Sequence, residues 1–217
     1  MYSQISLKTS DGKKLAANLF ESTNARGGVV FLHMMPATKS SYTDLDQIFQ
    51  NLGWEGIAVD FRGHGASDGG PEGYLEFSDL QHQEKYLDID AAVNYLKSRH
   101  IDESDIAIIG ASIGANLALK YLVQSKGIKS AILLSPGLNY RGITTKDLAT
   151  RLVSEKRVLF VGSEDDNYTK ECIEELYGLV PEGVEKKKQI YKDAGHGTTM
   201  LERNADCAEI IINFIIK

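Results

Sequence analysis

The chain has 217 residues, of which 42% are hydrophobic and 25% are charged, and its formal net charge is −6. This composition is typical of a globular enzyme, and the length is sufficient for one substantial core. We therefore expect a single domain spanning residues 1–217. The negative charge argues against nucleic acid or an anionic membrane as a partner, because both attract basic protein surfaces.

Two further features predict a cytoplasmic protein. No apolar run approaches the ~20 residues that cross a bilayer, and the first residues lack the charged-then-apolar pattern of a secretory signal peptide. Cys172 and Cys207 both fall in predicted helices and form no Cys-x-x-Cys pair. We interpret them as free thiols, which suit a reducing compartment.

Hydrophobic periodicity predicts an N-terminal hairpin followed by strands and helices in alternation. In chain order, the expected elements are hairpin strands at 3–8 and 15–20, a strand at 29–32, a helix from 40 or 41 to 52, a strand at 56–59, a long helix at 80–96, a strand at 105–109, a helix at 113–122, a strand at 131–134, a short helix near 145–153, a strand at 158–161, a helix around 172–177, a strand near 187–191 and a C-terminal helix around 205–215. The strands after the hairpin are mostly continuous apolar runs, which is typical of strands buried on both faces. The sequence thus predicts an α/β fold with a mostly parallel central sheet of about eight strands, an antiparallel N-terminal hairpin and helices on both faces.

The stretch Gly110-Ala111-Ser112-Ile113-Gly114 joins a predicted buried strand to a predicted helix. A tight turn at this place strains the backbone of the serine and exposes its hydroxyl at the positive end of the helix. Glycines on both sides leave room for strand and helix to approach each other. The strand–turn–helix context is the one that a G-x-S-x-G nucleophile elbow requires. Ser112 is therefore the candidate nucleophile, although an ordinary strand-to-helix turn is the alternative.

Candidate partners for Ser112 follow two later strands. In an open parallel sheet, chemistry collects at the carboxyl ends of the strands. The acidic residues 164–166 follow one predicted strand, and His196, between two glycines, follows the last. A serine nucleophile needs a base, and the base needs an acid that holds its tautomer. Asp193 is a rival acid, but its position is typical of a turn.

Taken together, these motifs resemble the α/β-hydrolase superfamily, in the form of a serine esterase with a small lid or none. The resemblance covers almost the whole chain, and the order Ser, Asp, His is the order of that family. The matching segments are the oxyanion loop at 32–36, the Asp-x-Arg-Gly-x-Gly-x-Ser loop at 60–67, the acid turn at 162–165 and the histidine turn at 194–196.

The resemblance implies a role for each candidate. Ser112 is the expected nucleophile, Asp165 the acid and His196 the base. The expected oxyanion hole consists of the backbone N–H groups of Met35 and Ile113. No cofactor is implied, and no histidine has the company of other ligands at a spacing that would predict a metal site.

Two positions leave alternatives open. Met34 stands where the family usually has glycine, so Met34 could replace Met35 as an oxyanion donor. Asp166 is the alternative acid, and Asp165 is preferred because it is the third residue after Gly162, as in the family turn.

The remaining candidate positions concern the pocket and the other histidines. We expect Met34, Leu138 and Met200 to line the substrate pocket. His33 is expected to orient its loop, whereas His82 and His100 are expected on helix surfaces.

The resulting functional hypothesis is hydrolysis of carboxylic esters of small acyl groups through an acyl-enzyme. The interval 135–157, where many relatives insert a lid, holds little more than a loop and one helix. An open pocket suits a small-molecule ester better than a long-chain lipid. A peptidase or acyltransferase on the same triad is the first alternative, and a non-catalytic small-molecule-binding protein is the second. No feature of the sequence specifies an oligomeric state.

Overall fold

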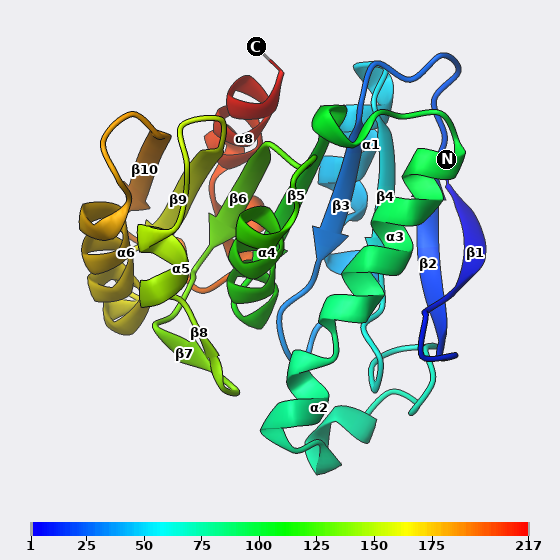
Figure 1. Cartoon of the computed structure of the whole chain (residues 1–217). Helices are drawn as coiled ribbons and strands as arrows, with labels where there is room; N and C mark the ends of the chain where they lie inside the picture. Colours follow the sequence, from blue (N-terminus) through cyan, green and yellow to red (C-terminus); the bar gives the residue numbers. More distant parts are fainter. Residues whose placement is uncertain (1, 217) are drawn as a thin grey trace.

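The computed structural model describes residues 2–216, which form an α/β sandwich around one large sheet (Figure 1). The strands are β1 (Ser3–Lys8), β2 (Lys14–Phe20), β3 (Gly28–Leu32), β4 (Glu55–Val59), β5 (Ile106–Ala111), β6 (Ser130–Leu134), β7 (Asn139–Tyr140), β8 (Ile143–Thr144), β9 (Arg157–Ser163) and β10 (Glu185–Tyr191). The helices are α1 (Thr43–Asn51), α2 (Asp79–Gln83), α3 (Tyr86–Ser98), α4 (Ile113–Gln124), α5 (Lys146–Thr150), α6 (Asn167–Leu179), α7 (Thr199–Arg203) and α8 (Ala205–Ile215). Short 3-10 turns lie at Lys39–Tyr42, Gly73–Glu76 and Glu103–Asp105.

The main sheet has eight strands in the order β1-β2-β4-β3-β5-β6-β9-β10. Strand β2 pairs antiparallel with β1 and β4, and the pairs from β4 to β10 are parallel. This arrangement confirms the predicted fold class, including the N-terminal hairpin. The element carrying Ser112, β5, lies between β3 and β6 near the middle of the sheet.

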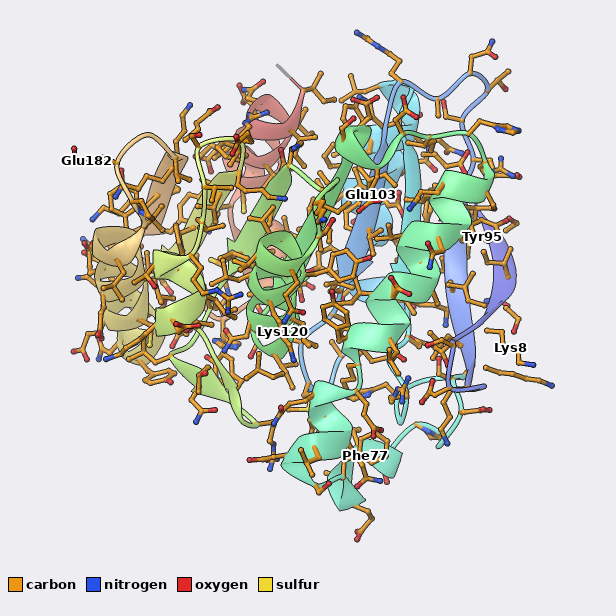
Figure 2. The ribbon with its side chains drawn as sticks, viewed as in Figure 1. Lys8, Phe77, Tyr95, Glu103, Lys120 and Glu182 are labelled. Atoms are coloured by element: carbon orange, nitrogen blue, oxygen red, sulfur yellow. The ribbon has the colours of Figure 1, made fainter. Side chains whose placement is uncertain are left out.

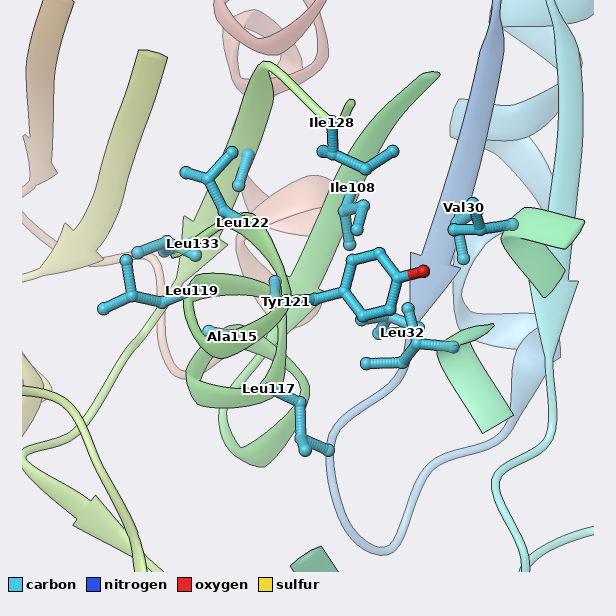
Figure 3. Packing of buried hydrophobic residues seen from close by; sticks show 14 of the residues in the cluster. Val30, Leu32, Ile108, Ala115, Leu117, Leu119, Tyr121, Leu122, Ile128 and Leu133 are labelled. Atoms are coloured by element: carbon cyan, nitrogen blue, oxygen red, sulfur yellow. The ribbon is translucent and has the colours of Figure 1, made fainter. Parts of the chain in front are cut away.

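Helices cover both faces of the sheet, as predicted. Figure 1 shows α3, α4, α5 and α6 in front of the sheet and α1 and α8 behind it. Successive residues of β5 alternate between the two buried clusters: Ile106 and Ile108 pack on the front face, and Ala107 and Ile109 pack on the back. A strand that is buried on both faces has no polar side, which explains its continuous apolar sequence. Figure 3 shows the front cluster, where the ring of Tyr121 on α4 lies between Ile108 and Leu32.

Three local features differ from the sequence prediction. The expected helix at 80–96 is divided into α2 and α3 at residues 84–85, and the expected C-terminal helix is preceded by a separate short helix, α7. The expected loop after β6 contains a small antiparallel hairpin, β7–β8. Figure 1 shows this hairpin and α2 beyond the carboxyl ends of the parallel strands, on either side of the N-terminal end of α4.

The two edges of the sheet are β1 and β10. Lys186, Lys187 and Lys188 lie on β10, one of these two edge strands. The side chains labelled in Figure 2 are distributed over the exterior, with Lys120 on α4, Glu182 in the loop before β10 and Phe77 beside α2. No helix within residues 2–216 has the length and apolar character that crossing a bilayer would require.

Candidate active site

Ser112 occupies the sharp turn between β5 and α4. Its φ of 54° and ψ of −118° lie outside the regions that L residues ordinarily adopt. The turn is held by the Ser112 N–H, which donates to the Leu134 carbonyl at 2.8 Å, and by the Ser112 carbonyl, which accepts from Ala115 N–H at 2.9 Å. The strained conformation predicted for the elbow is therefore present.

The glycines of the elbow allow backbone-to-backbone contact that a side chain would block. A Cβ atom at Gly110 would lie 2.1 Å from the Gly114 carbonyl oxygen, and one at Gly114 would lie 2.4 Å from the Leu32 carbonyl oxygen. The second contact brings the start of α4 against the end of β3. The loop that begins at His33 is thereby placed next to the N-terminus of the nucleophile helix.

This placement is the one that the expected oxyanion hole needs. The first N–H groups of a helix have no carbonyl partner within that helix, and Ile113 is the first residue of α4. Met35 lies in the adjoining loop, half-buried, and its side chain packs against the front core. Both residues proposed from the sequence thus come from the two segments that meet at Gly114.

His33 orients this loop by two hydrogen bonds, as expected. Its Nε2 accepts from the Phe61 N–H at 3.0 Å, so its Nδ1 carries the proton and donates to the Met34 carbonyl at 2.8 Å. The ring is completely buried, and burial lowers the pKa of His33 to about 4. The imidazole is therefore neutral near pH 7, which keeps one nitrogen as an acceptor and one as a donor.

The Asp-x-Arg-Gly loop at residues 60–67 is bonded to the oxyanion loop and to the elements around it. Buried Asp60 accepts from both the backbone N–H and the ammonium of Lys39, at 2.8 and 2.6 Å. Buried Arg62 donates to Asp88 at 2.8 Å and to Asp11 at 2.7 Å. This loop is thus tied to the neighbouring oxyanion loop, to α3 and to the N-terminal hairpin, which indicates a structural role.

His196 follows β10 and lies in a turn whose next residue, Gly197, packs against the elbow. The N–H of the next residue, Gly197, donates to the buried Ser135 hydroxyl at 2.9 Å. A Cβ atom at Gly197 would lie 3.5 Å from the Ala111 Cβ and 2.5 Å from the Met34 sulfur. The histidine turn is therefore packed against the residue that precedes Ser112.

The carboxylate beside His196 belongs to Asp166, not to the expected Asp165. The His196 Nδ1 and the Asp166 Oδ2 lie 2.6 Å apart. Asp165 instead bonds to the Ser163 hydroxyl and accepts from the Gly195 N–H at 3.1 Å. These hydrogen bonds, of which the one from Ser163 has the largest effect, lower the pKa of the Asp165 carboxyl to about 2.

The turn after β9 explains this correction. The Asp166 N–H donates back to the Ser163 carbonyl at 3.2 Å, which closes a tight turn over residues 163–166. Within that turn, Asp165 points at the backbone of the histidine loop, and Asp166 leaves the turn toward the imidazole. The rival acid Asp193 is exposed and lies 3.6 Å from Arg203. Because Asp166 is bonded to the Nδ1 of His196, the Nε2 is the nitrogen that can accept a proton from a serine.

The three expected pocket residues have different surroundings. Met34 is half-buried beside Gly197, at the histidine turn. Leu138 is half-buried between β6 and β7, packed on the front core. Met200 is completely buried in the back core behind the histidine turn.

Sequence reasoning missed two groups around this site. The ring of Tyr140 on β7 is half-buried and meets the ring of Tyr168, with the two centroids 6.1 Å apart. His82 was expected on a helix surface, but it is completely buried, and its Nδ1 lies 3.0 Å from the Nζ of buried Lys85. Lys85 in turn lies 3.8 Å from the Met35 sulfur, and burial lowers the pKa of Lys85 to about 7. His100 is exposed, as expected.

Neither group carried a usable signal in the sequence. Tyr140 lies in a two-residue strand that no periodicity marks. The chain changes direction at the break between α2 and α3, and the side chains of His82 and Lys85 at this break lie in the protein interior. No group of three or more His, Cys, Asp or Glu side chains within residues 2–216 is arranged to hold a metal ion.

Residues 23–157, more than half of the chain, match the model of a hydrolase family described as serine aminopeptidase, S33. The chain belongs to this family. The match includes the Ser112 elbow and the oxyanion loop, but Asp166 and His196 lie beyond it. The sequence interpretation as a member of the α/β-hydrolase superfamily is confirmed.

Other similarities support the fold of this α/β hydrolase. The polyketide transferase grgF of Penicillium sp is 27% identical over 141 residues, which are 64% of this chain and 47% of that protein. The matched part thus spans about half the length of this curated relative. The solved structure of DcsB with its substrate analogue aligns with a TM-score of 0.83 and 17% identity, covering 99% of this chain and 98% of DcsB. The esterase EaEST from Exiguobacterium antarcticum aligns with a TM-score of 0.77 and 17% identity, covering 99% of this chain and 100% of EaEST.

Proposed function

We propose that this protein hydrolyses carboxylic esters of small acyl groups with Ser112 as nucleophile, His196 as general base and Asp166 as the acid. The observation that carries the proposal is the pairing of His196 with Asp166 on a loop packed against the strained elbow of Ser112. An imidazole held by a carboxylate at one nitrogen can take the serine proton at the other.

The reaction follows from these positions. His196 takes the proton of Ser112 as the serine oxygen attacks the ester carbonyl carbon, and the backbone N–H groups of Ile113 and Met35 bind the developing oxyanion. His196 then gives the proton to the leaving alcohol, and water repeats the sequence on the acyl-enzyme. All proton transfers use the same imidazole, and no cofactor enters the sequence.

Two observations support small acyl groups. The segment between β6 and β9 contains only the β7–β8 hairpin and the five-residue helix α5. The hairpin is also bonded to α4 through the Asn116 side chain, which keeps it close to the helix that begins after Ser112. We therefore expect kcat/KM to be higher for p-nitrophenyl acetate and hexanoate than for dodecanoate. A kcat/KM that rises steadily to the dodecanoate would contradict this selectivity.

The test of the nucleophile is Ser112→Ala. This change removes one half-buried hydroxyl at almost constant volume, so we expect hydrolysis and fluorophosphonate labelling to be lost while Tm shifts by only a few degrees. A variant that keeps esterase activity would refute the proposal. A protein that binds esters without turnover would show neither labelling nor hydrolysis in its wild-type form.

A peptidase or acyltransferase on the same residues is the second candidate, because the family is described as serine aminopeptidase and one relative as a polyketide transferase. Amino-acid p-nitroanilides test the first activity, and product partition between water and an added alcohol tests the second. We further infer one domain acting in the cytoplasm on small-molecule esters; the buried free thiols of Cys172 and Cys207 accord with a reducing compartment.

A further inference from the structure

Lys85 is a completely buried lysine that the proposed reaction does not use. Its ammonium donates to the Nδ1 of His82 at 3.0 Å and to the sulfur of Met35 at 3.8 Å. The rings of Phe61 and Phe77 face the same ammonium, with their centroids 5.6 and 5.9 Å from Nζ. None of these four partners is a carboxylate, so none of them supplies a counter-ion for the charge of Lys85.

The acid that follows Lys85 on α3 is bonded to another cation. Asp88 accepts from the backbone N–H and from the guanidinium of Arg62, both at 2.8 Å. Burying an ammonium without a bonded counter-ion disfavours folding. A gain in stability therefore does not explain a lysine at this position.

The ammonium reaches the oxyanion loop by two routes. The sulfur of Met35 is four bonds from the Met35 nitrogen, so with Nζ 3.8 Å from that sulfur the ammonium lies within about 9 Å of the expected oxyanion donor. The ring of Phe61 connects Lys85 to His33, since the Phe61 and His33 ring centroids are 4.9 Å apart. His33 in turn donates to the Met34 carbonyl at 2.8 Å. The positive charge thus lies behind the loop that holds the expected donor.

We propose that Lys85 is a positioning residue that acts through the Met35 loop, holding the Met35 side chain and placing a positive charge behind the oxyanion. This inference rests on the proposed hydrolysis at Ser112. Lys85 does not touch the substrate, and none of its bonds or protons is exchanged in the reaction. The ester is neutral, whereas the tetrahedral intermediate carries a negative oxygen. A fixed positive charge therefore favours the intermediate over the bound ester, which is the condition for a catalytic effect.

The groups around Lys85 leave it as the one that changes charge near neutral pH. The titratable and charged side chains that act on this cluster are His82 on α2, Asp88 on α3, Arg62 and His64 in the 60–67 loop, His33 in the oxyanion loop and Arg141 in the β7–β8 hairpin. Burial lowers the pKa of His33 and His82 to about 4 and that of His64 to about 2, so these rings are neutral above pH 6. Burial raises the pKa of Asp88 to about 6, and the two guanidinium groups stay charged. Burial lowers the pKa of Lys85 to about 7.

The proposal predicts a loss of activity that depends on pH. At an effective dielectric constant of about 20, unit charges about 9–12 Å apart interact strongly enough to change a rate by about ten- to twentyfold. We therefore expect Lys85→Met to have a kcat/KM for p-nitrophenyl acetate about tenfold below that of the wild type at pH 6.5. At pH 9.0 the wild-type amine is neutral, and the two values should agree within about twofold. The titration of His196 is common to both proteins and cancels in the ratio.

Stability distinguishes this role from a structural one. Lys85→Met keeps most of the side-chain length and removes a buried charge, so its unfolding temperature at pH 7 should rise while its activity falls. A lysine that is needed only for packing would lower both when it is replaced. Lys85→Gln keeps a hydrogen-bond donor for His82 but has no charge. It should show the same pH-dependent loss of activity.

Lys120→Met is the matched control. Lys120 lies on the nucleophile helix α4 (Figure 2), and its ammonium lies over the ring of Tyr86, 5.6 Å from the centroid. The change removes the same charge from a lysine whose aromatic partner is on α3 rather than next to the oxyanion loop. We expect kcat/KM to stay within about twofold of the wild type at both pH values, because water and salt screen this charge.

Three results would overturn the assignment. A ratio of wild-type to variant kcat/KM that is the same at pH 6.5 and pH 9.0 would show that the charge has no effect. Lower unfolding temperatures in both Lys85 variants would make Lys85 a structural residue, and full activity in both would remove it from the reaction. Ser112→Ala separates these outcomes from failure of the proposed function. If that variant is inactive while the Lys85 variants keep full activity, the hydrolysis stands and only the role of Lys85 falls.

Discussion

Asp46 is a carboxylic acid buried without any hydrogen-bond partner, and its replacement should stabilise the protein in a pH-dependent way. The side chain lies on α1, is completely buried, and has neither oxygen bonded within the described part of the chain. It fills the space beside Gly56 of β4, where a Cβ atom would lie only 1.5 Å from its Oδ1. Burial raises the pKa of Asp46 well above its ordinary value.

The magnitude follows from proton linkage. The unfolded chain loses the Asp46 proton with a pKa of about 3.9, whereas the folded protein keeps it to much higher pH. The stability that protonation gives is thus complete below pH about 3.9 and is lost as pH rises toward the folded-state pKa. Each pH unit within this window costs the wild type about 1.4 kcal/mol, and Asp46→Asn removes that cost.

The assay is urea unfolding of both proteins at pH 4.5 and pH 6.0. Over these 1.5 units, the stability of Asp46→Asn relative to the wild type should rise by up to about 2 kcal/mol, which corresponds to about 4–8 °C in Tm. Asp44→Asn, an exposed change on the same helix, is the control and should show no such trend. If the difference between Asp46→Asn and the wild type is the same at both pH values, the buried carboxyl is ionised in the fold and the argument is refuted.

Two further predictions concern the site. Asp166→Asn should lower kcat by about 10³–10⁴, because it disturbs the tautomer of His196 and removes the charge that stabilises the imidazolium. Asp165→Asn should lower kcat far less. Steady-state kinetics that show the reverse order would restore Asp165 as the acid. Lys85→Met should raise the free energy of unfolding above that of the wild type, and this difference should be greatest at pH 7 and below. Because the folded amine has a pKa of about 7, the difference should shrink by about 1.4 kcal/mol per pH unit as pH rises from 7 toward 10. Unfolding curves that show the same difference at every pH would contradict this.

The elements and the elbow were predictable because their signals are local. A strand between two helix layers must be apolar throughout, and a tight strand-to-helix turn must have glycine where Gly110 and Gly114 meet neighbouring backbone. Such requirements act at each residue separately. They can therefore be recognised in a single sequence, and they led to Ser112 as the candidate nucleophile.

The choice between Asp165 and Asp166 was not predictable for a physical reason. The two carboxylates are adjacent, and the turn over residues 163–166 sends them in different directions. Which carboxylate meets the imidazole depends on where the 194–196 loop places its N–H groups. Asp165, for example, is bonded to the N–H of Gly195, which is 30 residues away in the sequence. The positions of Tyr140 and His82 depend in the same way on contacts distant in sequence.

The basic run on β10 has a consequence for how the protein behaves at high concentration. The outer edge of this strand offers unpaired N–H and C=O groups to any extended chain that approaches it. Lys186 is held against the carbonyls that end α6, Lys188 pairs with Glu174, and Lys187 is exposed. A second strand adding here would have to take ammonium groups out of water, and a second copy of the same edge would also bring like charges together. The lysines thus act as a barrier to edge-to-edge aggregation, and threonines or valines in their place would make this strand a template for it.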